Sequence, residues 1–129
     1  MPKKPPKILI VDDEMEICQM IVFNFDTRGF ETFSANDPEK AMEIVKEHDL
    51  DIVISDVRMP KGGGVKLLAD IKKYNPNKPK VFLLSGFSDI TAEEAVEQGA
   101  EALIVKPFRL NELAQQIRDR FRAGLDGCF

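Results

Sequence analysis

Short apolar runs recur along the chain and alternate with longer amphipathic segments. Four of these runs contain only apolar residues, which is typical of strands buried on both faces of a parallel sheet. A fifth segment alternates apolar and polar positions, as a half-exposed edge strand does. The pattern therefore predicts five strands, at 7–12, 30–35 (the alternating segment), 51–55, 80–84 and 102–105.

Helix-start and helix-stop residues stand between these strands. Gly29 suits the left-handed position that ends a helix. Asp37 and Pro38 form an N-cap followed by proline at the first helical position, while Thr91 and Glu94 have capping-box spacing. The last segment places apolar residues at i, i+3, i+4, i+7 and i+11, which forms one apolar stripe. Helices are predicted at about 14–28, 38–48, 65–74, 91–99 and from Leu110 onward.

Five strands that alternate with five helices predict an α/β fold, a (βα)5 doubly wound parallel sheet with right-handed crossovers. The amphipathic second strand belongs at an edge and the most apolar strands belong inside, so the expected strand order is 2-1-3-4-5. The 129 residues fit one domain, 1–129, with a core at about 7–122 and short tails. Four phenylalanines are expected in or near the core: Phe23, Phe25, Phe30 and Phe33.

The overall charge and the cysteine usage exclude several classes of protein. A formal net charge of -4 gives no basic surface for direct binding of nucleic acid. Apolar runs are too short to span a membrane, and the proline- and lysine-rich segment 1–7 is no signal peptide. Cys18 and Cys128 form no disulfide framework, so a reduced cytoplasmic location is expected.

Residues able to handle a phosphoryl group follow four of the predicted strands. In open α/β sheets, ligands bind beyond the carboxyl ends of the strands, where the strand order reverses. Clustered carboxylates suit a hard cation such as Mg²⁺, and a carboxylate can act as a nucleophile toward phosphorus. A lysine and a hydroxyl would then stabilise the transferred group. We expect the following residues to meet in one pocket: Asp12, Asp13, Asp56, Ser85 and Lys106.

Four of these residues also have an ordinary structural explanation. Asp13 alone is more simply the N-cap of the first helix, and Asp56 alone is a common turn residue. Ser85 alone can begin a loop, and Lys106 alone can be a surface lysine. Their joint placement at strand ends is what favours a phosphoryl-handling site over these separate explanations.

The motifs around these residues resemble those of response-regulator receiver domains of the CheY-like kind, which act in two-component signal transduction. The family's acidic pair is matched by Asp12 and Asp13, and its phosphoacceptor motif by 55–60 (SDVRMP) with Gly64 downstream. The family's hydroxyl after the fourth strand is matched by 84–86 (LSG), and its closing Lys-Pro-Phe by 106–108. The match spans about 7–122.

This resemblance implies the family's flavodoxin-like fold and a role for each matched residue. Asp56 would be the phosphorylated aspartate, and Ser85 and Lys106 would contact the phosphoryl group. The Lys106–Pro107 peptide bond would be cis. Mg²⁺ would be held by Asp12, Asp13, Asp56 and the backbone carbonyl of Arg58.

The resemblance also implies the partners of the chain. We expect a stand-alone receiver that accepts a phosphoryl group from a sensor histidine kinase or a phosphotransfer protein. It would phosphorylate itself from small donors and lose the group slowly, as a switch and not as a metabolic enzyme. A downstream protein would bind the face formed by the fourth helix, the fifth strand and the fifth helix.

One position departs from the family. Leu103 stands three residues before Lys106, where the family usually has Tyr or Phe that turns inward upon phosphorylation. Leucine cannot reproduce that movement with the same shape, so signal output is expected to differ.

Three other functions compete with this interpretation. A flavodoxin-like protein that binds FMN would need a phosphate-binding loop after the first strand, where this chain has Asp12 and Asp13. A phosphohydrolase with an aspartyl intermediate usually has a second carboxylate where Arg58 stands. A non-phosphorylated interaction module on the same fold is the third alternative, and Leu103 favours it slightly.

Overall fold

The computed structural model describes residues 5–59, 63–86 and 90–126 of the chain, with side chains described up to 121. Pro60 and Cys128 therefore lie outside the described residues. The strands are β1 (Lys7–Val11), β2 (Glu31–Ala35), β3 (Ile52–Asp56), β4 (Lys80–Ser85) and β5 (Ala102–Val105). The helices are α1 (Met15–Asp26), α2 (Pro38–Glu47), α3 (Gly63–Tyr74), α4 (Ala92–Glu97) and α5 (Leu110–Asp126).

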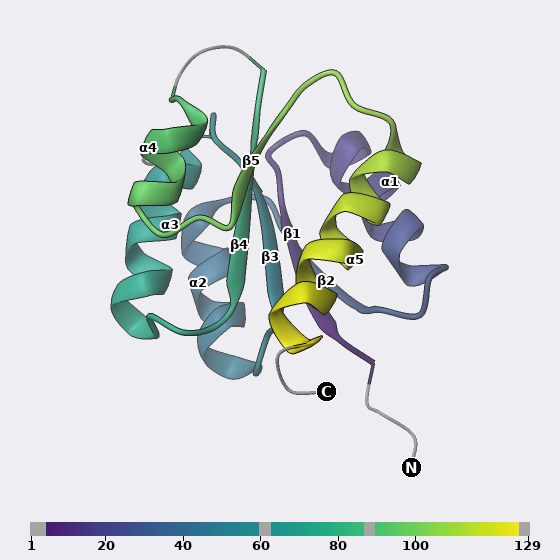
Figure 1. The fold of residues 1–129 in the computed structure, drawn as a ribbon, viewed down its shortest axis with the longest axis horizontal. Coiled ribbons are helices and arrows are strands. Elements are labelled where there is room, and N and C mark those ends of the chain that lie inside the picture. The colour runs from purple at the N-terminus through teal and green to yellow at the C-terminus, as the bar shows by residue number, and fades with distance from the viewer. Residues whose placement is uncertain (1–4, 60–62, 87–89, 127–129) are drawn as a thin grey trace.

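All five strands are parallel and lie in the order β2-β1-β3-β4-β5, as the sequence predicts. Figure 1 shows α1 and α5 on one face of the sheet and α2, α3 and α4 on the other. The order reverses between β1 and β3, because the chain moves from β1 to one edge and then returns to the other side. This reversal is the switch point at which a ligand site is expected.

The two faces of the sheet carry separate apolar layers. Ile8 and Ile10 pack under α1 and α5, while Leu9 and Val11 pack under α2, α3 and α4. All four side chains are almost fully buried, because helices cover both faces of a central strand. β2 pairs only with β1 and has one buried residue, Ala35, which confirms it as the edge strand.

The predicted helix boundaries are confirmed where a capping residue was recognised. The Asp37 side chain accepts a hydrogen bond from the Lys40 backbone N–H, and Thr91 forms the expected capping box with Glu94. Gly29 has φ +89°, the left-handed conformation that suits glycine after a helix. No helix in the described ranges is long and apolar enough to cross a membrane.

The prediction that Phe23 belongs to the core or its margin is wrong, because its side chain is 69% exposed. On α1 the inward positions are Ile21 and Phe25, which are four residues apart and share one helix face. Phe23 lies halfway between them in sequence and therefore projects from the opposite side of the helix.

Candidate functional site

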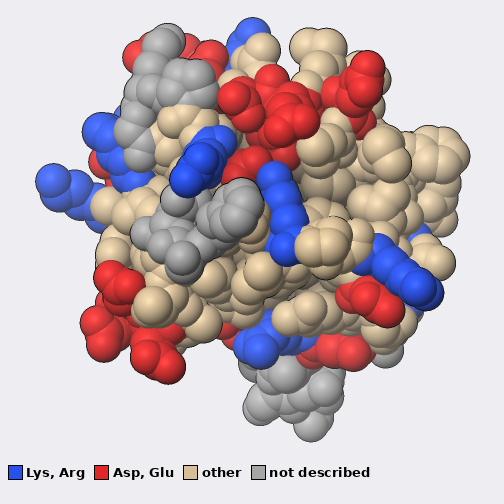
Figure 2. Space-filling view, turned by 90° about the horizontal axis from the view of Figure 1, so that it is seen from above, with Lys and Arg blue, Asp and Glu red and all other residues tan. Residues whose placement is uncertain are grey.

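The parallel register brings the ends of four strands to one edge of the sheet. Val11 of β1 pairs with Ser55 of β3, and Ser85 of β4 pairs with Val105 of β5. The polar residues in and just after these strands therefore emerge side by side. Figure 2, which looks down on this edge, shows acidic side chains gathered beside basic ones. The predicted residues Asp12, Asp13, Asp56, Ser85 and Lys106 all belong to this carboxyl edge.

Three carboxylates form the centre of the carboxyl edge. One oxygen from each of Asp12, Asp13 and Asp56 lies within 4.8 Å of the other two. Asp12 and Asp56 are buried, with 1% and 5% of their surfaces exposed, whereas Asp13 is exposed. Like charges this close repel one another unless a cation lies among them.

The donor set fits a hard divalent cation. Asp12 Oδ1 accepts a hydrogen bond of 2.9 Å from the Glu14 backbone N–H, which fixes the carboxylate plane. Asp12 Oδ2 is buried and has no hydrogen-bond partner among the described residues. A buried oxygen without a partner is costly, and an oxygen-binding cation such as Mg²⁺ would satisfy it.

The pKa of Asp12 reflects this environment. Burial raises the pKa of Asp12 to about 6, against the opposing effect of the Glu14 N–H hydrogen bond. The negative charge of Asp56 raises it further, while the positive charge of Lys106 lowers it. Asp12 is thus a carboxylate that the folded, metal-free protein ionises with difficulty.

Lys106 is the counter-charge of Asp56. Its Nζ donates a 2.8 Å hydrogen bond to Asp56 Oδ2, while Asp56 Oδ1 accepts one of 3.2 Å from the Arg58 backbone N–H. Burial lowers the pKa of Lys106, but the hydrogen bond and charge of Asp56 outweigh it and the pKa is raised overall. Asp56 is therefore held in one orientation by a charged and a neutral donor.

The strand ends that carry Lys106 and Ser85 are joined directly. The Lys106 backbone N–H donates to the Ser85 carbonyl oxygen at 2.8 Å, and the Ser85 side chain is buried. The Lys106–Pro107 bond is cis, as the family resemblance implies, and Lys78–Pro79 is a second cis bond that the sequence analysis did not anticipate.

Two glycines allow α3 to begin against the end of β3. A Cβ on Gly64 would collide with the backbone carbonyl oxygen of Asp56, and one on Gly63 would collide with that of Val57. Gly63 also has φ +68°, which disfavours other residues. The motif match pointed to Gly64, but the role of Gly63 depends on its close approach to the Val57 carbonyl oxygen, which the sequence does not reveal.

Leu103 lies half-buried in β5 and packs against the apolar layer under α2, α3 and α4. Val105, two residues later on the same face, has 62% of its surface exposed. The departure from the family at Leu103 is therefore a packed side chain, not an open position.

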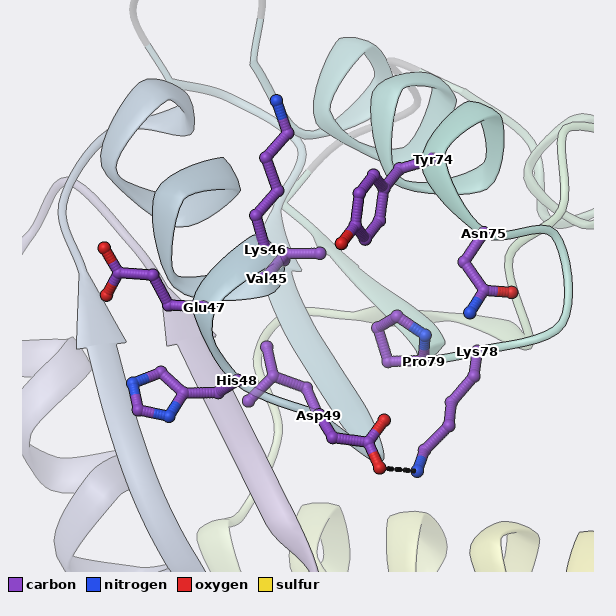
Figure 3. A pocket seen from close by; sticks show the side chains of 10 residues that line it. Val45, Lys46, Glu47, His48, Asp49, Tyr74, Asn75, Lys78 and Pro79 are labelled. Carbon is purple, nitrogen blue, oxygen red and sulfur yellow. Dashed lines mark hydrogen bonds and ion pairs between the residues drawn. The ribbon is translucent and has the colours of Figure 1, made fainter.

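A separate cavity of about 240 Å³ lies at the opposite, amino edge of the sheet (Figure 3). Lys78 pairs there with Asp49 at 3.2 Å. In Figure 3 the His48 side chain points away from Tyr74, and its ring lies 4.4 Å from that of Phe33, centroid to centroid. None of the residues predicted to handle a phosphoryl group lines this cavity.

The family of the chain is identified by comparison with known proteins of similar sequence and fold. The sequence model of the response regulator receiver domain matches residues 8–118. The Escherichia coli (strain K12) regulatory protein AtoC is 37% identical over 108 residues, which cover 83% of this chain and 23% of AtoC. The chain therefore spans about a quarter of the length of that relative.

Solved structures agree with this match. The receiver domain of the Francisella response regulator 1452 has a TM-score of 0.83 and 30% identity, covering 92% of this chain and 98% of that one. A receiver domain protein from Clostridium thermocellum has a TM-score of 0.84 and 33% identity, covering 92% and 96%. With the family model matching most of its length, the chain belongs to the response regulator receiver domain family.

Proposed function

We propose that this receiver domain accepts a phosphoryl group on Asp56 from a sensor histidine kinase or a phosphotransfer protein. The observation that carries the proposal is the setting of Asp56: a buried carboxylate at the switch point, 2.8 Å from the Lys106 ammonium and beside two further carboxylates. A nucleophilic carboxylate, a fixed cation and an acidic metal-binding set are the parts that phosphoryl transfer requires.

The transfer exchanges one bond to phosphorus for another. An Asp56 carboxylate oxygen forms a bond to phosphorus while the bond to the donor's histidine nitrogen breaks, and the electron pair leaves with the imidazole. Lys106 then neutralises charge on the transferred group, and the Ser85 hydroxyl donates a hydrogen bond to it.

The metal in this proposal is Mg²⁺. Asp12, Asp13, Asp56 and the backbone carbonyl of Arg58 would hold it. When bound, it offsets the negative charge of the phosphoryl oxygens and of the carboxylates that surround them. The unpartnered Asp12 Oδ2 supports this assignment.

Two exposed apolar surfaces, one on either side of Asp56, could each bind a protein partner. On α1, which begins beside the carboxylates, Met15, Met20 and Phe23 are each more than half exposed. This surface suits the phosphodonor protein. Val96 on α4 and Val105 on β5 are also more than half exposed, which suits a downstream protein at the α4–β5–α5 face.

These two surfaces are separable by mutation. Phe23→Ser should slow transfer from a phosphodonor protein while labelling by a small donor stays unchanged. Val105→Ser should leave both transfer reactions intact and weaken only the binding of a downstream partner. If Val105→Ser slows transfer from the phosphodonor protein, or Phe23→Ser weakens only downstream binding, the proposed surfaces are wrong.

The switch is proposed to work with little movement of β5. Leu103 already packs against the apolar layer, so no aromatic ring has to turn inward there. A phosphate mimic at Asp56 should shift the backbone resonance of Ser85 strongly and that of Leu103 weakly. A large, concerted change that reaches Leu103 would overturn this part of the proposal.

The domain is proposed to act alone, in the cytoplasm, with self-phosphorylation from small donors and slow self-dephosphorylation. Helices on both faces of the sheet support independent operation, and the buried free thiol of Cys18 suits a reducing compartment. The size of the native protein on an immunoblot tests whether the domain acts alone. Its distribution among cell fractions tests the cytoplasmic location. The decay of the labelled protein tests the last.

Intact-mass measurement tests the acceptor role. The wild-type chain, incubated with a small acyl phosphate and Mg²⁺, should gain one phosphoryl group, and chelation of Mg²⁺ should suppress the gain. Asp56→Asn should gain none. An unmodified wild-type chain, beside a control receiver that is labelled in the same buffer, would favour a non-phosphorylated interaction module.

A further inference from the structure

A second cavity adjoins the carboxyl edge on the β2 side. It has a volume of about 220 Å³ and lies between α1 and the start of α2. Asp12 forms part of its wall, together with Cys18 from α1 and Ser34 from β2. Lys40, in the first turn of α2, closes it from the other side.

The two charged side chains of this cavity, Asp12 and Lys40, form no ion pair with any described residue. Asp12 Oδ2 is buried and accepts no hydrogen bond from any described residue. The Lys40 ammonium forms no hydrogen bond or ion pair within the part of the chain that the structure describes. Lys106 is bonded to Asp56, and its positive charge also acts on Asp12.

The position of Lys40 is fixed by the local structure of α2. Its backbone N–H donates a 2.8 Å hydrogen bond to the capping carboxylate of Asp37, so the backbone of the helix start is held in place. The Lys40 side chain can change rotamer, but its ammonium group stays near the cavity because the backbone that carries it is fixed.

We propose that Lys40 is a second cation, beside Lys106, that acts on the metal-free acidic site and lowers the affinity of this site for Mg²⁺. Without metal, its positive charge attracts the Asp12 carboxylate across the cavity. When Mg²⁺ binds, the same charge opposes the incoming cation. The inference rests on the metal site of the proposed function, and Lys40 acts through Asp12 as a positioning residue.

Mg²⁺ titration followed by calorimetry tests this directly at low ionic strength, with no phosphodonor present. Lys40→Met should bind Mg²⁺ about three-fold more tightly than the wild type, and Lys40→Glu about ten-fold more tightly. Raising the salt concentration should shrink both differences. Lys46→Met is the matched control, because Lys46 lies on the same helix about 9 Å further along and does not line this cavity.

Thermal unfolding in metal-free buffer separates a link through Asp12 from a diffuse charge effect. Lys40→Met should lower the midpoint by about 1–3 °C in the wild-type background. In an Asp12→Asn background the same change should have no effect, because the carboxylate that Lys40 attracts is gone.

The outcomes distinguish the two proposals. If Mg²⁺ binds the wild type and Lys40→Met with equal affinity, the role of Lys40 is overturned and the metal site stands. If Lys40→Met lowers the midpoint equally in both backgrounds, the link to Asp12 is wrong. If the wild type binds no Mg²⁺, both the metal site and this inference fail.

Discussion

At the amino edge of the sheet, one lysine forms ion pairs with two aspartates. At the carboxyl edge, one lysine forms an ion pair with only one of three clustered aspartates. Lys78 Nζ is 3.2 Å from both Asp49 and Asp51, and Asp51 also accepts a hydrogen bond from the Lys7 backbone N–H. Asp49 is 84% exposed at its side chain, so water solvates what the lysine does not neutralise. The amino edge is therefore close to electrostatic balance.

The carboxyl edge departs from that balance in both charge and burial. Asp12 and Asp56 are almost fully buried, and Lys106 forms an ion pair with Asp56 but not with Asp12. Such an arrangement costs stability in the metal-free protein, and a surface ion pair like that of the amino edge contributes little either way. The difference teaches that uncompensated burial, and not the mere presence of acidic residues, marks the functional edge.

The largest expected effect is on the pH dependence of stability in metal-free buffer. The pKa of Asp12 is about 6 in the folded protein and near 3.8 in the unfolded chain. As pH rises from about 4 to 6 the unfolded state loses this proton first, so the folded state loses stability, by up to about 3 kcal/mol. Urea unfolding at several pH values in the presence of a chelator measures this loss. Asp12→Asn should remove it, and an unchanged pH profile in that variant would contradict the account.

Removing the lysine from each edge should have unequal consequences for phosphoryl transfer. Lys106→Met should slow single-turnover labelling by about 100-fold, because the fixed charge beside Asp56 is lost. Lys78→Met, the matched change at the amino edge, should leave the rate unchanged. Comparable losses in the two variants would show that the comparison between the edges is mistaken.

The backbone under the carboxyl edge should tolerate substitution less than an open turn does. Gly64→Ala should cost about 2 kcal/mol of unfolding free energy, because the added Cβ forces the Asp56 carbonyl to move. Gly29→Ala should cost about 1 kcal/mol, because that residue has positive φ but no neighbour within 4 Å of an added Cβ. Chemical denaturation measures both losses. If Gly64→Ala costs no more unfolding free energy than Gly29→Ala, the close approach of Gly64 to the Asp56 carbonyl is refuted.

Asp13 gives the smallest expected effect, confined to metal binding. Asp13→Ala should weaken Mg²⁺ binding by about ten-fold, because one of three converging carboxylates is removed. Asp51→Ala at the amino edge should leave the affinity unaltered. The Asp13 side chain is exposed, so its loss should hardly change metal-free stability. Equal Mg²⁺ affinity in Asp13→Ala and the wild type would exclude Asp13 as a ligand.

Much of this architecture could be predicted from the chain alone, because its local signals agree. The apolar runs and the capping residues Asp37, Thr91 and Gly29 predicted the elements and the strand order that the structure has. The pattern also predicted which polar residues meet at the carboxyl edge. These features depend on strand ends and helix ends, which neighbouring residues largely determine.

Other features depend on tertiary geometry and could not be predicted this way. The exposure of Phe23 follows from the rotation of α1 on the sheet. The unpartnered oxygen of Asp12 and the cavity that it shares with Lys40 arise from how α1 and α2 approach the edge. The residue types at these positions reveal neither the unpartnered oxygen nor the cavity.

The most direct measurement is to locate the modified residue. The wild-type chain would be incubated with a small acyl phosphate and Mg²⁺, trapped with borohydride and mapped by peptide mass spectrometry. The account predicts one modified residue, Asp56, with Asp49 and Asp51 untouched. Modification of an amino-edge aspartate with Asp56 intact, or the absence of any modification, would contradict it.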